Sequence, residues 1–179
     1  MLYFVECSYR DPTSEGEWNE FYSREKLPAL VSVTGFRSSQ RFRAIKPGCP
    51  AYLAIHTVKD ADVLSSEEYR HKGGGNFSRW QVWITDWQRN LYAYDASAPA
   101  VSSDEILLLS AQPSSALVAA SINQATEMHA VGLARSPARR TMCVLPRECA
   151  LPLIHMPDVY LYEPLTSQLQ HAFEHQREV

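Results

Sequence analysis

The 179-residue sequence predicts an α+β fold built from two consecutive halves. The first observation is the order of segments up to residue 95, which alternate between period-2 and helical patterns as βαββαβ. The second is a serine-rich stretch at 96–103, interrupted by Pro99, which is typical of a boundary. The third is that a similar series of segments begins again after it. We therefore expect one half at 1–95 and the other at 104–179.

The first half begins with a β-rich segment at 2–7 and continues with an amphipathic helix. Ser14 and Glu17 have the spacing of a capping box, in which each side chain accepts the backbone amide of the other residue. Aromatic residues at i, i+3 and i+4 then give the helix one apolar face. Pro28 lacks an amide proton, so the regular helix is expected to bend or stop near Lys26.

The rest of the first half predicts two paired strands, a second helix and a fourth strand. Residues 36–44 and 51–57 alternate with a rough period of two around a turn that contains proline and glycine. Residues 60–70 have a helical pattern, 73–75 form a flexible glycine loop, and 80–94 hold the fourth strand. This order is the ferredoxin-like plan, with antiparallel strands.

The second half is predicted as βαββα. The expected strands are 106–111, 141–145 and 158–163, and the expected helices are 114–130 and a closing helix at 165–175.

A faint internal repeat supports this organisation. The strand 52–57 parallels 159–164, and each is followed by a segment that begins with Leu and a hydroxyl residue. This register places His56 opposite Glu163. The alternative is that two unrelated helical starts both use Ser or Thr as a cap.

Composition restricts the partners and the location. With 45% hydrophobic residues, the chain is globular, and its formal net charge of -3 comes without the basic stripe that nucleic-acid binding requires. The N-terminal segment is too short and lacks a basic region for a signal peptide or membrane span, so we expect a cytoplasmic protein. The four cysteines form no C-x-x-C pair and are predicted to be reduced thiols. No metal site and no cofactor is expected.

Seven short motifs carry a family resemblance. They are Trp18, Phe21-Tyr22, Leu27-Pro28, Gly35-Phe36, Arg41-Phe42-Arg43-Ala44, Tyr52-Leu53-Ala54 and Leu64-Ser65-Ser66 with Tyr69. Together they resemble the dimeric α+β barrel superfamily, in particular its EthD-like and related small-barrel members. The resemblance implies two ferredoxin-like halves that form a barrel with helices outside, and it raises a homodimer as one assembly. Such families include cofactor-independent oxygenases, lactone isomerases, heme-degrading enzymes and proteins with no assigned chemistry.

Relatives of this kind often have His just before the Leu-Pro pair, whereas this chain has Lys26. A lysine with its ordinary pKa of about 10.4 is a fixed cation rather than a base near neutral pH. The search for a site therefore moves from the end of the helix to the strands.

Alternation along the strands predicts which side chains face the barrel interior. The side chains expected to face the helices are Tyr3, Val5, Leu53 and Ile55. Those expected inside are Leu2, Phe4, Glu6, Arg41, Arg43, Tyr52, Ala54 and His56.

Glu6, Arg41 and His56 would then converge in a mostly apolar lumen. His56 could act as a base and Arg41 could stabilise developing negative charge. Tyr22, Tyr52 and Glu163 complete the predicted ligand-binding set, although a helix that docks on a sheet also needs its aromatic residues for packing. The alternative is that Glu6 and Arg41 form an ion pair while His56 bonds to Glu163 or to the backbone.

These residues predict a protein that binds a small apolar or aromatic compound with an acid or carbonyl group, coupled to cofactor-independent proton transfer or oxidation. Two alternatives stay open. One is a non-catalytic small-molecule-binding or assembly module. The other is a heme-binding barrel with His56 or His71 as axial ligand. His171 and His175 have the i, i+4 spacing of metal ligands, but a solvated helix face is the simpler interpretation.

Overall fold

In the computed structural model, which describes residues 1–172, the strands β1 to β8 close into an antiparallel barrel. The first half contains β1 (Leu2–Tyr9), α1 (Glu15–Phe21), a π-helical segment (Tyr22–Lys26), α2 (Leu27–Val31), β2 (Phe36–Ala44), β3 (Tyr52–Val58), a 3₁₀ segment (Ala61–Ser65), α3 (Glu67–His71), another 3₁₀ segment (Ser78–Trp83) and β4 (Ile84–Tyr92). The second half contains β5 (Glu105–Ser110), α4 (Ser114–Val118), β6 (Thr126–Leu133), β7 (Arg139–Pro146), α5 (Arg147–Ala150), a 3₁₀ segment (Leu151–His155), β8 (Val159–Pro164) and a short β9 (Leu169–Gln170).

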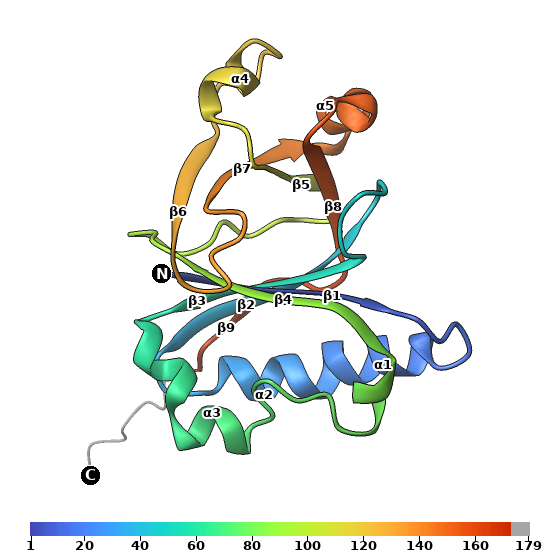
Figure 1. Ribbon diagram of the computed structural model, residues 1–179, viewed down its shortest axis with the longest axis vertical. Helices are drawn as coiled ribbons and strands as arrows, with labels where there is room; N and C mark the ends of the chain where they lie inside the picture. Colours follow the sequence, from blue (N-terminus) through green and yellow to red (C-terminus); the bar gives the residue numbers. More distant parts are fainter. Residues whose placement is uncertain (173–179) are drawn as a thin grey trace.

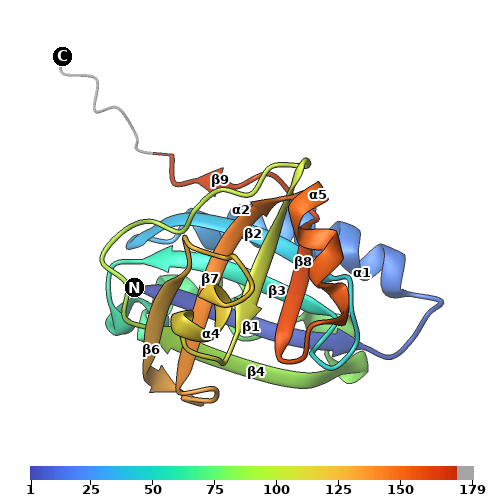
Figure 2. The same ribbon diagram turned by 90° about the horizontal axis from the view of Figure 1, so that it is seen from above.

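The strand order confirms two ferredoxin-like halves. The strands of the first half lie in the order β4-β1-β3-β2, and those of the second half lie in the order β8-β5-β7-β6. In each half this is the fourth strand, then the first, the third and the second. The pairs β4–β6 and β2–β8 join the halves and close the barrel. Figure 1 shows α1, α2 and α3 below the first-half sheet and the second-half strands above it, and Figure 2 shows the second-half strands lying across those of the first.

Three apolar clusters follow from this closure. One lies between the first-half sheet and its helices and includes Tyr3, Trp18 and Tyr22. A second fills the lumen and includes Phe4 and Tyr92. A third lies on the outer face of the second half, under its short helices. Because sheet strands here are covered on both sides, every residue of β3 is buried.

The boundary segment predicted at 96–103 packs against the barrel. Ala98 and Val101 belong to the lumen cluster. The amide of Ala98 donates to Thr57 Oγ1 at 2.9 Å, and Gln40 exchanges two hydrogen bonds with the backbone of Val101. The segment therefore helps to fill the lumen instead of forming a loose linker.

The helix predicted at 114–130 is wrong over most of its length. Helix α4 ends at Val118, and Ser121 has a positive φ of 65°, which breaks helical geometry. From Thr126 the chain is strand β6, which pairs with both β7 and β4. The pairing of β6 with β4 and β7, which closes the barrel, therefore outweighs the helical spacing of the apolar residues in 114–130.

The closing helix predicted at 165–175 is also wrong within the described residues. Leu165 and His171 donate their amides to the carbonyls of Arg41 and Arg37, so this stretch runs extended along β2. On β2, strand β8 pairs only with Phe42, Arg43 and Ala44, which leaves backbone groups of β2 for the C-terminal segment to satisfy. His175 lies outside the described residues.

The alignment of the two segments in the proposed internal repeat is also wrong. Strand β3 is the third strand of its half and β8 is the fourth, so the two segments compared in the sequence hold different positions in the fold. The third strand of the second half is β7. His56 and Glu163 are therefore not equivalent positions.

The predicted capping box is absent, whereas the proline has a milder effect than expected. The Ser14 hydroxyl donates to Asp11 at 2.6 Å and makes no cap hydrogen bond to α1. The helix is continuous near Pro28, because the π-helical turn Tyr22–Lys26 connects α1 directly to α2. Pro28 lies in the first turn of α2, where a missing amide proton is tolerated.

A bidentate ion pair crosses the lumen between the halves. Arg140 on β7 donates to both carboxylate oxygens of Glu6 on β1, at 3.1 and 2.8 Å, and Glu6 is 1% exposed. The Arg140 guanidinium also lies 5.3 Å from the ring centroid of Phe4. The partner of Glu6 is thus Arg140, which corrects the predicted pair with Arg41.

We expect Glu6→Leu to lower the free energy of unfolding by about 3–5 kcal/mol, because it leaves the Arg140 charge buried and unpaired. Urea denaturation at neutral pH measures the loss. The double variant Glu6→Leu/Arg140→Met should recover most of it, since both charges are then absent. A double variant as unstable as the single one would show that the pair is not the reason.

Candidate functional site

The structure divides the predicted site residues between two layers. Glu6 lies in the lumen, whereas Arg41 and His56 lie between the sheet and the helices. The predicted phase is correct for β1 and inverted for β3. Tyr3 pairs directly with His56, and directly opposed residues of antiparallel strands share a face, so His56 must face the helices with Tyr3.

The other members of the predicted set are also separated. Tyr22 and Tyr52 belong to the layer between sheet and helices and flank Arg41. Glu163 lies on β8 with its carboxylate 3.7 Å from Arg147, and it makes no contact with His56. The structure therefore brings together Arg41, Tyr22 and Tyr52 but leaves Glu6 and Glu163 elsewhere.

His56 is the most deeply buried titratable group of this layer. Its Nδ1 lies 2.6 Å from Ser39 Oγ, and its Nε2 has no hydrogen-bond partner. The ring stacks on Tyr3 at 5.5 Å and meets the edge of Phe36 at 5.3 Å between centroids. Burial, helped by the charge of Lys26, lowers the pKa of His56 to about 3. The imidazole is thus neutral at pH 7.

Tyr3, which stacks on His56, links that ring to a second tyrosine and an arginine. The hydroxyls of Tyr3 and Tyr69 lie 2.8 Å apart, and Arg89 donates to Tyr3 at 3.3 Å. Tyr69 comes from α3, which covers the sheet here (Figure 1). Burial raises the pKa of Tyr69 above its ordinary value, so its hydroxyl stays protonated and can donate.

Lys26, at the position where relatives often have His, holds the glycine loop. Its ammonium donates to the carbonyls of Gly73 and Asn76 and lies 4.7 Å from the ring centroid of Phe77. Burial lowers the pKa of Lys26 to about 8. Gly74 cannot carry a side chain, since a Cβ there would lie 2.3 Å from the Tyr69 ring.

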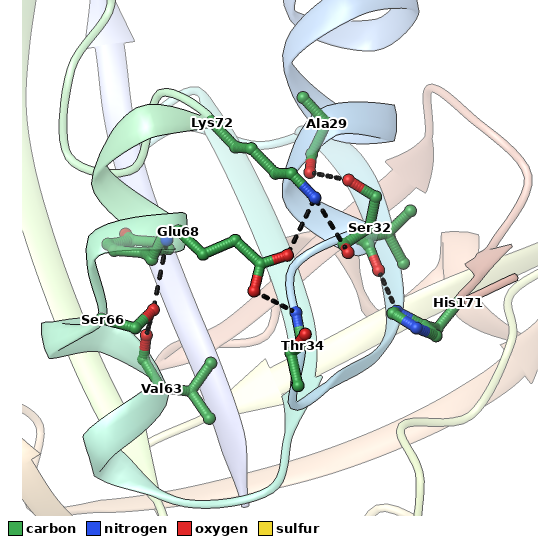
Figure 3. A network of polar contacts seen from close by, with 10 residues as sticks. Ala29, Ser32, Thr34, Val63, Ser66, Glu68, Lys72 and His171 are labelled. Atoms are coloured by element: carbon green, nitrogen blue, oxygen red, sulfur yellow. Dashed lines mark hydrogen bonds and ion pairs between the residues drawn. The ribbon is translucent and has the colours of Figure 1, made fainter. Parts of the chain in front are cut away.

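The start of this loop is anchored to the end of α2, as Figure 3 shows. Lys72 donates to Glu68 at 2.9 Å and to the carbonyl of Ser32 at 3.2 Å, and Glu68 accepts the amide of Thr34 at 3.1 Å. His171 approaches the carbonyl of Val31 at 2.8 Å. The loop predicted to be flexible is therefore fixed at its root by α2 and over its glycines by Lys26.

Arg41 lies one residue pair further along the same face of the sheet, since Ser39 pairs with His56 and Arg41 with Ala54. It is 1% exposed and donates to Asn19 and to Ser23. Its guanidinium carbon lies 4.1 Å from the Tyr22 ring centroid. Burial lowers the pKa of Arg41 to about 10, so it remains a cation at neutral pH.

The two histidines considered as heme ligands differ in exposure, and the heme-binding alternative stays a prediction. His71 is exposed at the end of α3, whereas His56 is fully buried. Among the described residues no group of three or more His, Cys, Asp or Glu could hold a metal ion. Within the same range, no helix has the length and apolar character needed to cross a membrane.

Sequence reasoning missed four members of the cluster around His56: Tyr3, Ser39, Tyr69 and Arg89. Strand register, which fixes Tyr3 and Ser39 opposite His56, was not available from alternation alone. Lys26 was marked by its departure from relatives, but its contact with the glycine loop spans 47 residues of sequence. The side chains of the cluster come from several separate elements.

Comparisons with known proteins support the fold and leave the chemistry open. No protein-family model and no curated protein matches the chain. An anthrone oxidase-like protein has a similar structure, with a TM-score of 0.58 and 10% identity over 99% of this chain and 96% of its own. A monooxygenase-like protein from Fusobacterium nucleatum gives 0.60 and 9%, over 96% and 95%. One from Lactobacillus acidophilus gives 0.52 and 7%, over 96% and 97%.

The fold and the closure define this chain as a small α+β barrel protein of two ferredoxin-like halves, like these three structures. At such low identity the likeness shows the fold alone. The EthD-like resemblance and the homodimer stay predictions.

The neutral state of His56 predicts an acid-dependent loss of stability. In the unfolded chain the imidazole takes up a proton below pH 6.5, whereas in the folded chain its pKa is about 3. Between these two pKa values the unfolded state therefore binds more protons than the folded state. As the pH is lowered through this range, the free energy of unfolding decreases by up to about 1.4 kcal/mol per pH unit. Urea denaturation at a series of pH values should show that the free energy of unfolding depends less steeply on pH in His56→Gln. His71→Gln is the control and should keep the original slope; an unchanged slope in His56→Gln would contradict the buried neutral imidazole.

Lys26→Met should loosen the glycine loop, because a charge-assisted hydrogen bond is worth about 1.5–3 kcal/mol. We expect amide hydrogen exchange at Gly74 and Asn76 to accelerate about tenfold or more. The exposed Lys59→Met is the matched control. Equal exchange in both variants would mean that Lys26 does not hold the loop.

Proposed function

We propose that the barrel binds a small aromatic compound with a carbonyl or acid group between the first-half sheet and its helices, and oxidises it without a cofactor. The observation that carries this proposal is the neutral, fully buried His56 with an unpartnered Nε2. A buried polar atom without a partner costs free energy, which a ligand that bonds to it would recover. The anthrone oxidase-like neighbour adds a substrate class to test.

In this proposal His56 acts as a base. When Nδ1–H donates to Ser39, the lone pair of Nε2 is free to accept a proton. The proton would come from a CH₂ group conjugated to an aromatic ketone, which leaves an enolate. Lys26 and the protonated hydroxyl of Tyr69 stabilise negative charge on the enolate oxygen.

The oxidation balances with O₂ as the named oxidant. The enolate passes electrons to O₂; the CH₂ group becomes a carbonyl with one oxygen atom, and the other oxygen leaves as water with the two hydrogens. The protein supplies the base, the cations and a dry layer, while O₂ supplies the oxidising power.

The layer is closed in this structure, with His56 and Tyr69 buried. Ligand entry in this proposal requires the loop at 73–76 to leave Lys26. The contacts that would open are the hydrogen bonds from Lys26 to the backbone carbonyls of Gly73 and Asn76.

Oxygen uptake with anthrone as the probe tests the proposal. The purified chain should consume O₂ and form anthraquinone, including after EDTA treatment. His56→Gln should lower kcat about 10²- to 10⁴-fold, the usual contribution of a positioned base. His71→Gln, at an exposed site, should keep full activity.

If the chain binds anthrone, seen as a change in tryptophan fluorescence, but consumes no O₂, the oxidase proposal is wrong and a non-catalytic binding module is supported. Equal rates in the His56 and His71 variants would remove His56 as the base.

A further inference from the structure

A groove of about 260 Å³ lies beside α1 and β2, where Arg41 lines it with its guanidinium carbon 4.1 Å from the Tyr22 ring centroid. It differs from the closed layer around His56, since His56 does not line it. Its lining residues are Asn19, Glu20, Ser23, Arg24, Arg41, Arg43 and Leu165.

Arg41 brings a buried positive charge to this groove without a counter-charge. Its guanidinium donates to the carbonyl and side-chain oxygens of Asn19 at 3.2 and 2.8 Å and to Ser23 at 2.8 Å, all neutral acceptors. Within residues 1–172, Arg41 forms no ion pair. The Glu15 carboxylate reaches this network only through the Tyr52 hydroxyl, at 2.9 Å. A buried guanidinium is ordinarily paired with an anion.

The surrounding rings hold the guanidinium in position. Its central carbon lies 4.1, 5.3 and 5.5 Å from the ring centroids of Tyr22, Trp18 and Tyr52. Such contacts stabilise a cation but leave its charge in place. The guanidinium also has more N–H donors than the three bonds above use.

The rim adds a second cation and an apolar wall. Arg43 is exposed and lies 5.8 Å from the Tyr52 ring centroid, with no ion pair among the described residues. Glu20 and Arg24, also on the rim, pair with each other at 3.0 Å and so cancel. Leu165 supplies apolar surface beside the two uncompensated arginines.

We propose that this groove binds the carboxylate of a small aromatic acid, with Arg41 and Arg43 as its cations and Ser23 and Asn19 as polar neighbours. The planar guanidinium matches a carboxylate, which can accept two parallel N–H bonds. The assignment goes beyond the proposed function, since the groove is separate from the layer around His56 and the acid can bind there without turnover.

Titration of the full chain with benzoate, followed by calorimetry, tests the site. Benzoate should bind at millimolar concentrations or below, and benzamide, which has the same shape without the charge, should bind about tenfold more weakly. Acetate should also bind about tenfold more weakly, because it lacks the ring. Benzamide equal to benzoate would overturn the carboxylate assignment, and acetate equal to benzoate would overturn the aromatic one.

Two arginine variants place the site. Arg41→Gln should lower benzoate affinity about tenfold or more, and the exposed Arg43→Gln, which leaves the α1 contacts intact, about two- to fivefold. Arg139→Gln, an exposed arginine on β7, is the matched control and should bind like the original chain. If all three variants bind benzoate with the affinity of the original chain, the groove is not the site. If Arg41→Gln fails to fold, the benzoate affinity of Arg43→Gln is compared with that of Arg139→Gln, and equal affinities would overturn the proposal.

Benzoate binding by His56→Gln separates this proposal from the oxidase. Affinity unchanged in that variant supports an acid site in the groove, whether or not anthrone is oxidised. Loss of benzoate affinity in His56→Gln, with Arg43→Gln unaffected, would place the acid in the closed layer and overturn the groove.

Discussion

Closure of the sheet into a barrel is the constraint on which the rest of the structure depends. Once β2 pairs with β8 and β4 with β6, the first-half strands are covered on one face by helices and on the other by the second half. No face is left to water along β3. The polar side chains that are buried on these strands must therefore find a partner inside the protein or remain unsatisfied at a cost in free energy.

The two buried layers meet that requirement differently. In the lumen Glu6 and Arg140 neutralise each other, and the linker residues fill the remaining space. Between sheet and helices, charge and hydrogen bonding are left incomplete: His56 Nε2 has no partner, Arg41 has no anion among the described residues, and Lys26 is held by carbonyl oxygens alone. The second half covers its outer face with an apolar cluster. Among the described residues, the buried side-chain atoms without a hydrogen-bond partner are Trp18 Nε1 and His56 Nε2 in the helix layer and Tyr162 Oη in the lumen. The helix layer therefore holds the larger share of the unpartnered polar groups and the two unpaired cations.

Burial on both faces also explains how far the sequence could predict the fold. The element order of the first half followed from turns, glycines and helical spacing, which are local signals, and it is confirmed. The phase of β3 was wrong because alternation identifies a face only when one side is polar, and β3 is buried throughout. The helix expected at 114–130 failed for a related reason, since Leu117 packs on the outer face and Met128 in the lumen, so their spacing reflected two layers. His56 and Arg41 were proposed as site residues from residue type alone, whereas the partners that the structure gives them depend on strand register.

Two buried cations lie at different places in the layer between the sheet and the helices. Lys26 lies toward the glycine loop and Arg41 toward the open groove, with Tyr22 within 6.0 Å of the one and 4.1 Å of the other. The positive charge of Lys26 and the low polarity of the layer both lower the pKa of His56, so the imidazole stays an unprotonated acceptor. The charge of Lys26, which disfavours a protonated imidazole, also favours a negative charge nearby. Burial and the charge of Lys26 thus together keep His56 unprotonated at neutral pH.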